Sequence, residues 1–498
     1  MQNGIRIAAV DLGSNSFRLE IGQHEHGQIR PSEYLKEPVR LGGGLDAQRN
    51  LTLVAMQRGW DCLARFGERL AGFKKTQVRA VATQTLREAR NRDAFLTRAN
   101  EVLGFPIEVI SGQEEARLIY QGVAHGLPQS DERRLVMDIG GRSTELILGH
   151  GYTADQMESY RVGSVAWSMK YFPDGQFSEE AFELAEVAAK AVLDEALGIF
   201  PRNGWDIAYG SAGTIGAVAD ILHAAGHPAQ RVTRDGLLWL VDKLIKAQSS
   251  DRVRLDGLKD DRRPVIGGGV SVLKAVFDLF EIEELHAAGG ALRHGVLYEM
   301  LNREQGDTDT RSATVHRLAA KFSVDIAQAQ RVVRIAGTLL GELQPRDGDS
   351  EERENAARVL AWAAELHEIG TGISHSDHHK HGAYILDHAD APGFAQSELH
   401  RLSLLVLGHR GKLKKLEEAD FSDAEFVRQL LALRLAVLLC HARRDPDMSG
   451  LRLQELDNTF TLTCRTGWAL DYPQSAHLLR EEVSAWAKVG WQLELALG

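Results

Sequence analysis

The chain has 498 residues and a formal net charge of −11, with 44% hydrophobic and 26% charged residues. This composition is typical of a globular protein, and the length predicts several domains, because one hydrophobic core rarely serves more than about 250–300 residues. The negative net charge argues against indiscriminate nucleic-acid binding, so no nucleic-acid partner is expected. A cleft with local positive charge could still bind a polyanion.

The cysteines and the apolar segments indicate in which cellular compartment the protein is expected. Three cysteines without paired spacing fit a reducing cytosol and predict neither a disulfide framework nor a zinc site. The N-terminus lacks a basic region followed by an apolar core, which is the pattern of a signal peptide. The longest apolar stretch, residues 430–440, is interrupted by Arg434 and falls short of the roughly 20 residues that span a bilayer. We therefore expect a cytoplasmic protein without a transmembrane segment.

Residues 1–128 mix strand and helix patterns and are expected to form one lobe. Apolar periodicity predicts helices at 52–71 and 88–103. Ser111 with Glu114 three residues later is the capping-box pattern, which predicts a further helix to about residue 125. Short apolar runs predict strands at 5–10, 17–22, 78–82 and 107–110.

A second strand-and-helix region, residues 129–303, is expected to form another lobe. Beyond it the strand patterns disappear, and residues 304–445 are expected to form an all-helical domain. The segment "FTLTCRTGWAL" and a final amphipathic helix predict a small α+β domain at 446–498. The helices expected in the all-helical domain are 312–321, 326–343, 351–365 and 425–441.

One short pattern occurs twice. The segment "AAVDLGSNSFRLEIG" covers residues 8–22, and "LVMDIGGRSTELILG" covers residues 135–149. Aligned, they place Asp138 on Asp11, Gly140 on Gly13 and Ser143 on Ser16. Each copy is an apolar strand that ends in an acid, passes through a small polar turn and resumes as a strand, so a duplicated β-hairpin is predicted.

Tight Gly- and Ser-containing turns expose several backbone N–H groups in one concave patch, which binds phosphate. An acid beside such a turn repels a bare phosphate, by about 4 kcal/mol at 4 Å and an effective dielectric of 20. A divalent cation between acid and phosphate reverses that sign, and oxygen ligands suit Mg²⁺, here at Asp138 with Asp11 as a further ligand. The alternative is a pair of ordinary hairpins. The predicted phosphate-binding residues are Asp11, Gly13, Ser14, Asn15, Ser16, Gly140, Gly141 and Ser143.

Longer segments follow one another in the order typical of one family. The resemblance is carried by "AVDLGSNSFRL", "VATQTLREARN", "ISGQEEARLIYQGV", "DIGGRSTELILG" and "ALRHGVLYEML". These resemble the exopolyphosphatase/guanosine pentaphosphate phosphohydrolase family of the actin, sugar-kinase and Hsp70 superfamily, and the chain looks most like a bacterial exopolyphosphatase. The resemblance implies an α/β fold of two actin-like (ribonuclease H-like) lobes with duplicated phosphate-binding hairpins, then a helical HD-like domain and the small C-terminal domain. It also implies a homodimer.

The resemblance assigns roles to four side chains. Glu115 is implied to be the general base that activates water, whereas its neighbour Glu114 fits an acid favoured at a helix N-terminus. Asp138 and Glu145 are implied to hold Mg²⁺ and order the water, and K⁺ is a further cation to consider. Arg87 is implied to contact phosphate. The alternative for Glu145 is a solvated hairpin residue, and without the family Arg87 would be an exposed helix residue.

The sequence departs from the family pattern in the second turn. Arg142 stands where a third Gly is usual, and Thr85 replaces a small residue before Leu. Arg142 would be strained if its φ had to be positive, so we expect a permissive backbone, with the guanidinium pointing out of the turn or towards substrate. Arg18 and Arg117 are weaker phosphate-binding candidates, and either could instead form a surface ion pair.

Two segments of the helical region raise separate questions. His367-Glu368 resembles the His-Asp pair of HD-domain phosphohydrolases, and further histidines follow, so the segment predicts either a metal site or, with Glu in place of Asp, polar packing or anion contact. The basic segment after His409 is either a solvated loop or a guide for a polyphosphate chain. The histidines are His375, His378, His379 and His381, and the basic residues are Arg410, Lys412, Lys414 and Lys415.

The sequence thus predicts a Mg²⁺-dependent exopolyphosphatase that removes terminal phosphate from inorganic polyphosphate. The close alternative is hydrolysis of guanosine pentaphosphate (pppGpp) to ppGpp, alone or as a second activity, because both substrates end in a phosphoanhydride. A non-catalytic polyphosphate or nucleotide sensor and a kinase of the same superfamily are the alternatives from other classes. The retained acids argue against a sensor, and the position implied for Glu115 favours water over another acceptor.

Overall fold

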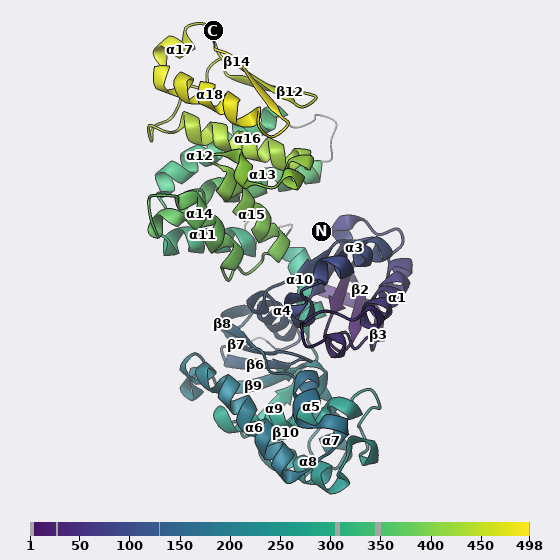
Figure 1. The fold of residues 1–498 in the computed structure, drawn as a ribbon. Coiled ribbons are helices and arrows are strands. Elements are labelled where there is room, and N and C mark those ends of the chain that lie inside the picture. The colour runs from purple at the N-terminus through teal and green to yellow at the C-terminus, as the bar shows by residue number, and fades with distance from the viewer. Residues whose placement is uncertain (1–3, 26–27, 129, 304–308, 344–349, 498) are drawn as a thin grey trace. The chain divides into compact units, whose positions relative to one another are not determined.

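The computed structural model describes residues 4–25, 28–128, 130–303, 309–343 and 350–497. They form two compact units, Met1–Asp309 and Thr310–Gly498, which are described separately (Figure 1). The boundary expected at 303/304 lies near this break, beside residues 304–308, which are outside the described ranges. Across the described ranges, no helix combines the length and the hydrophobicity needed to cross a membrane.

The first sheet of unit 1 has the strand order β3-β2-β1-β4-β5. Strands β1, β2 and β3 are antiparallel neighbours, whereas β4 and β5 run parallel to β1. The strands are β1 Arg6–Leu12, β2 Phe17–Glu25, β3 Gln28–Glu37, β4 Val78–Ala82 and β5 Ile107–Val109. The helices are α1 Leu53–Arg69, α2 Gln84–Glu88, α3 Arg92–Leu103 and α4 Gly112–Ala124. The four expected strands are confirmed, and β3 is an additional edge strand.

The helix expected at 88–103 is wrong in its first part. Helix α2 ends at Glu88, and α3 begins only at Arg92. Between them the Asn91 side chain exchanges hydrogen bonds with the backbone of Leu51, at 2.8 and 3.0 Å. The break therefore coincides with a tertiary contact to a segment forty residues earlier, which apolar periodicity does not reveal.

The second sheet has the strand order β10-β11-β9-β6-β7-β8. Its strands are β6 Arg133–Ile139, β7 Thr144–His150, β8 Thr153–Tyr160, β9 Ile207–Ser211, β10 Arg231–Thr233 and β11 Glu284–Ala287. Hairpin β6–β7 is antiparallel and β9 pairs parallel to β6, as β4 does to β1, so the predicted duplication is confirmed. The helices are α5 Ser164–Tyr171, α6 Glu179–Leu193, α7 Ala212–Ala224, α8 Arg234–Ala247, α9 Ile266–Leu279 and α10 Leu292–Arg303.

Helices α4 and α10 join the two sheets. They pack on each other, and α4 also contacts β7 and β8 while α10 contacts β1. Their backbones approach closely: a Cβ added to Gly295 would lie 1.7 Å from the Leu118 carbonyl oxygen, and one added to Gly122 would lie 2.2 Å from that of Ala291. A shared apolar cluster contains residues of both sheets, among them Ala9 and Ile147. The lobe boundary at 128/129 stays a prediction, because α4 precedes it in the chain but packs on strands of the second sheet.

Unit 2 is helical, with a small sheet near its end. The helices expected at 312–321, 326–343, 351–365 and 425–441 are confirmed within two residues at each boundary, whereas α14 and α15 were not expected. The elements are α11 Thr310–Lys321, α12 Ile326–Leu343, α13 Ser350–Glu365, α14 His378–His388, α15 Gln396–Gly408, α16 Ala424–Leu439, β12 Arg452–Leu456, β13 Thr459–Thr463, α17 Trp468–Asp471, α18 Pro473–Trp486 and β14 Gln492–Ala496. One apolar core runs from Val315 to Leu493, so the sheet packs on the helices.

Candidate active site

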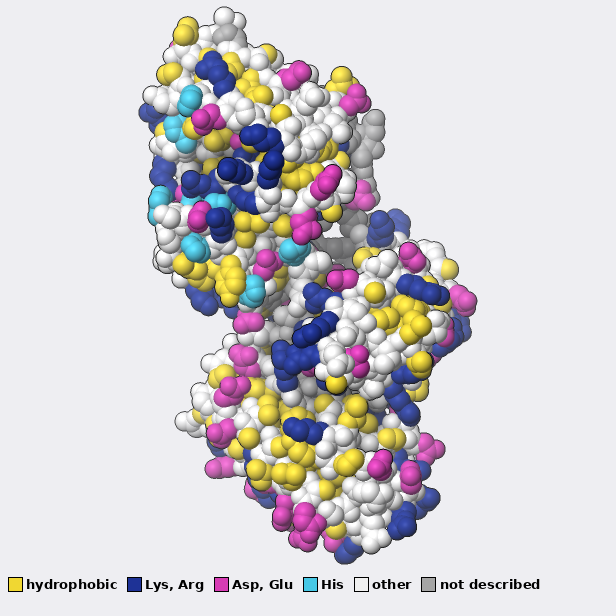
Figure 2. Space-filling view, in the orientation of Figure 1, with side chains coloured by type: hydrophobic (Ala, Val, Ile, Leu, Met, Phe, Trp, Pro, Cys, Tyr) yellow, Lys and Arg dark blue, Asp and Glu magenta, His cyan; other side chains and the backbone are white. Residues whose placement is uncertain are grey.

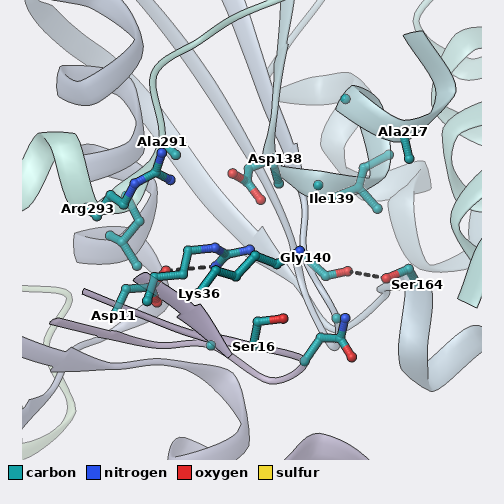
Figure 3. Close-up of a pocket in the computed structure, with 18 of the residues that line it drawn as sticks. Asp11, Ser16, Lys36, Asp138, Ile139, Gly140, Ser164, Ala217, Ala291 and Arg293 are labelled. Carbon is teal, nitrogen blue, oxygen red and sulfur yellow. Dashed lines mark hydrogen bonds and ion pairs between the residues drawn. The ribbon is translucent and has the colours of Figure 1, made fainter. Parts of the chain in front are cut away.

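The two hairpin turns of unit 1 line one cleft of about 390 Å³. Asp11 and Ser16 enter it from the first hairpin, and Asp138 and Gly140 enter it from the second (Figure 3). The predicted residues that it brings together are Asp11, Gly13, Ser14, Asn15, Ser16, Glu115, Asp138, Gly140, Gly141 and Ser143. The sequence-based expectation that the two turns face each other is confirmed.

The turns approach to within side-chain contact. A Cβ added to Gly141 would lie 2.9 Å from the Ser14 Cβ, so only glycine fits at this point without displacing the first turn. The second turn is held by Ser164, whose hydroxyl donates to the Gly140 carbonyl at 3.0 Å (Figure 3). Asn15 Nδ2 and Ser16 Oγ are buried without a hydrogen-bond partner. Buried polar atoms are nearly always paired, so these two indicate a polar ligand in the cleft.

Glu115 lies in the first turn of α4, which the sequence places correctly. The Ser111 hydroxyl caps this helix by accepting from the Glu114 N–H at 3.1 Å. The Glu115 carboxylate pairs with Arg87 Nη1 at 2.8 Å. Burial raises the pKa of Glu115, and Arg87 offsets part of that increase. A carboxyl group with a raised pKa is suited to accept a proton near neutral pH.

Asp138 and Glu145 are also buried, so the solvated interpretation of Glu145 is wrong. Burial, with the nearby charge of Glu115, raises the pKa of Asp138 to about 7. The pKa of Glu145 is held well above its usual range by burial and by the charges of Glu115 and Asp138. The Ser159 hydroxyl donates to Glu145 at 2.7 Å, which fixes the carboxyl group. Three carboxyl groups therefore disfavour ionisation together, and a cation would relieve their repulsion.

The donor set fits a magnesium ion that is completed by the substrate. Among the residues described, no three His, Cys, Asp or Glu side chains form a complete metal-binding group. Mg²⁺ commonly uses one or two carboxylates and fills its other positions with water and phosphate oxygens. Asp138 and Asp11, which line the cleft, would hold it; Glu145 is not among the lining residues, so its share in holding the ion stays a prediction.

Arg87 lies in a position that differs from the predicted one. It is not among the residues that line the cleft. Besides Glu115, its guanidinium donates to the Ile110 carbonyl at 2.9 Å and to the side-chain oxygen of Gln84 at 2.7 and 3.0 Å. It is largely buried, so the exposed-helix alternative is wrong, and its contact with phosphate stays a prediction.

A basic wall of the cleft was missed from the sequence. It consists of Lys36, Lys259, Arg262 and Arg293, together with the weaker candidate Arg18. Arg18 pairs with Asp11 at 2.9 Å in the cleft rather than on the surface, and Lys36 of β3 pairs with Asp261 at 2.8 Å. Burial, with Arg18 nearby, lowers the pKa of Arg262. These cations supply the local positive charge that a polyanion needs in an acidic protein.

The remaining arginine and acid candidates have structural roles. Arg117 is buried and binds Glu114 at 2.8 Å and Glu299 at 3.1 Å, away from the cleft lining. Arg142 has no positive φ, as expected, and its guanidinium turns towards Glu88 instead of into the turn. Thr85 donates to the Ser14 hydroxyl at 2.7 Å and so supports the first turn.

Unit 2 has a separate cavity of about 520 Å³ lined by His367, His378, His409 and Arg410. Burial lowers the pKa of each of these histidines, which favours their neutral form. On the face shown in Figure 2, histidines lie among Lys and Arg side chains of this unit. Lys412 and Lys414 are exposed, whereas burial lowers the pKa of Lys415 to about 7. A role of the basic segment in guiding substrate stays a prediction.

Comparison with known proteins places these features in a family. Residues 21–304 match the Ppx/GppA phosphatase family, and residues 310–483 match its domain III. A guanosine-5'-triphosphate,3'-diphosphate pyrophosphatase of Vibrio atlanticus is 39% identical over 98% of this chain and 97% of that relative. One of Photobacterium profundum is 37% identical over the same shares.

Solved structures match part of the chain. An exopolyphosphatase from Cytophaga hutchinsonii has a TM-score of 0.55 at 25% identity, covering 60% of this chain and 98% of that one. The Aquifex aeolicus Ppx/GppA family member has a TM-score of 0.51 at 27% identity, with the same coverage. The chain has the two-lobe actin-like fold followed by a helical domain, acts as a hydrolase of phosphoanhydride bonds, and belongs to the Ppx/GppA phosphatase family.

Proposed function

We propose that the protein hydrolyses the terminal 5′ phosphoanhydride of pppGpp, which gives ppGpp and orthophosphate. The relatives named for a guanosine pentaphosphate substrate align with nearly the whole chain, at 37–39% identity. The exopolyphosphatase activity favoured by the sequence motifs has weaker support, since that name comes from a structure that covers 60% of the chain. It is retained as the second candidate.

One observation carries the proposal: the two phosphate-binding turns line the same cleft as Glu115. In the proposed reaction a water oxygen attacks the terminal phosphorus, and Glu115 accepts the proton that this water loses. The bond from that phosphorus to the bridging oxygen breaks, and the oxygen leaves with ppGpp. A magnesium ion at Asp138 and Glu145 would neutralise charge on the phosphate oxygens. The N–H groups of the turns hold the phosphate chain in line.

The basic wall supports a substrate with more than one anionic group. Lys259 and Arg293 line the cleft with the turns, and neither belongs to the hairpins that would hold the reacting phosphates. A 3′-diphosphate is an anionic group that such additional cations would bind. A long polyphosphate would use the same cations, so the two substrates must be compared directly.

The test is phosphate release from pppGpp, long-chain polyphosphate and GTP, each with Mg²⁺ and with EDTA. We expect the highest kcat/KM for pppGpp, and loss of turnover in EDTA. Higher kcat/KM for polyphosphate would replace the proposal by the second candidate, and binding without turnover would favour a sensor.

The base is tested by Glu115→Gln, which keeps size and hydrogen bonding but cannot accept the proton. We expect kcat to fall by at least a thousandfold while pppGpp still binds. Glu101→Gln, at an exposed position of α3, is the matched control and should leave kcat unchanged. Full activity of the Glu115 variant would refute the assigned base.

A further inference from the structure

Arg142 connects the two lobes directly. It lies in the turn between β6 and β7 of the second lobe, and both of its partners lie in the first lobe. Its Nη2 is 2.8 Å and its Nε 3.2 Å from Glu88 Oε2, at the end of α2. Its Nη1 donates to the Gly42 carbonyl at 3.2 Å. The side chains of Arg142 and Glu88 are 20% and 11% exposed, so the pair is largely shielded from water.

A chain of hydrogen bonds leads from this pair to Arg87, which in turn forms an ion pair with the proposed base. The other oxygen of Glu88 accepts from the Gln84 side-chain nitrogen at 2.6 Å. The Gln84 side-chain oxygen accepts from Arg87, whose Nη1 lies 2.8 Å from Glu115. An ionised carboxylate can only accept hydrogen bonds, so the Gln84 side chain must point its NH₂ group towards Glu88. Its oxygen then faces Arg87. The orientation of each member therefore depends on the one before it.

We propose that Arg142 is a positioning residue that couples closure of the two lobes to the orientation of Arg87 at the proposed base, Glu115. The inference rests on the proposed function for the role of Glu115, and the link itself rests on the contacts above. When the lobes are closed, Arg142 reaches Glu88, which fixes Gln84 and then Arg87. When they separate, Arg142 is withdrawn, and the amide of Gln84 is free to rotate.

Two features of the structure exclude a simpler role for Arg142. It is not among the residues that line the cleft, so it does not contact the phosphates there. It is also not a solvated surface cation, since three of its nitrogen atoms are engaged by acceptors of the other lobe.

The kinetic test compares Arg142→Ala, Glu88→Gln and the double variant on the preferred phosphoanhydride substrate. We expect each single variant to lower kcat at least tenfold with less than a threefold change in KM. The double variant should be no slower than the slower single one, because both residues act through one path. Arg142→Lys, which reaches fewer acceptors, should recover part of kcat. Arg161→Ala, an exposed arginine near the same hairpin, is the control.

A pH profile separates positioning from a general loss of structure. Arg87 lowers the pKa of Glu115, so a less well-held Arg87 lets that pKa rise. At saturating Mg²⁺, which suppresses proton competition at Asp138 and Glu145, the acidic limb of kcat/KM should therefore move to higher pH in Arg142→Ala, and stay in place in Arg161→Ala. An unmoved limb, or additive losses in the double variant, would overturn the proposal.

A measurement without substrate distinguishes this proposal from the proposed function. In the ligand-free protein, hydrogen exchange over residues 84–88 and 140–143 should be faster in Arg142→Ala than in the wild type, and unchanged in Arg161→Ala. Unchanged exchange at either segment would refute the link whatever the substrate is. Faster exchange at both, in an enzyme that Glu115→Gln leaves active, would support the link and refute only the assigned base.

Discussion

Asp138 on β6 lies directly opposite Glu145 on β7 in the antiparallel register, so two buried carboxyl groups share one face of the second hairpin. Both pKa values are raised, that of Asp138 to about 7. With Glu115 in the same neighbourhood, the site binds protons more readily than ordinary carboxylates do.

The first prediction concerns pH and metal together. Mg²⁺ binds the ionised carboxylates, so protons and metal compete for Asp138 and Glu145. We expect activity to fall below about pH 7, and the midpoint to move to lower pH as Mg²⁺ is increased. Initial rates from pH 5.5 to 9 at several Mg²⁺ concentrations measure this. A midpoint independent of Mg²⁺ would remove Asp138 and Glu145 as ligands.

The second prediction separates stability from activity at Asp138. Its pKa is about 7 in the folded protein and near 3.8 when unfolded, so between these values the folded state binds more protons. The free energy of unfolding therefore decreases as pH rises from about 4 to 7 through this group. Asp138→Asn, which stays neutral, should stabilise the protein above pH 7 by at most about 4 kcal/mol, with no gain below about pH 4.

Urea unfolding at pH 4 and pH 8 measures that difference, and the same variant should lose turnover. Lower stability of Asp138→Asn at pH 8 would show that the carboxylate is stabilised by partners and would contradict the raised pKa.

The third prediction concerns the contact between the turns. A Cβ at Gly141 would meet the Ser14 Cβ at 2.9 Å, so Gly141→Ala should push the first turn away and lower kcat/KM at least tenfold. At Gly43, a Cβ would meet nothing within 4 Å, so Gly43→Ala is a matched control for the loss of a glycine. Equal activity of the two variants would mean that the turns do not need their close approach.

The fourth prediction tests the basic wall. Lys259 lines the cleft and is exposed. Lys259→Ala should therefore raise KM severalfold and leave kcat unchanged, because the lysine would bind the substrate and the transition state equally well. Lys246→Ala, also exposed but outside the cleft lining, should change neither constant. The KM difference should shrink at high salt, because the interaction is screened.

Much of the site could be predicted because its residues belong to local patterns. The duplicated hairpin shows in the sequence as apolar strands with an acid and a small polar turn, and Ser111 marks the start of the helix that carries Glu115. The basic wall had no such pattern. Lys36 lies on β3, whose charged edge-strand sequence "QIRPSEYLKE" has no apolar alternation, and Lys259 lies in a loop far along the chain. Only the fold brings those charges together.

The partners of Arg87 and Arg142 could not be predicted either. A guanidinium at a given position can reach an acid, a carbonyl or a ligand, and sequence spacing does not select among them. In the structure Arg87 binds Glu115 and Arg142 binds Glu88 of the other lobe. Helix α14 was missed for a different reason: its sequence is "HHKHGAYILDH", where histidines interrupt the apolar periodicity.

The close crossing of α4 and α10 leaves no room for a larger residue at Gly122 or Gly295. Glu115 lies on α4, seven residues before Gly122, so the contact that holds the two sheets together also fixes the helix that carries the proposed base. A side chain added at either glycine would therefore displace that helix without altering any residue of the cleft lining.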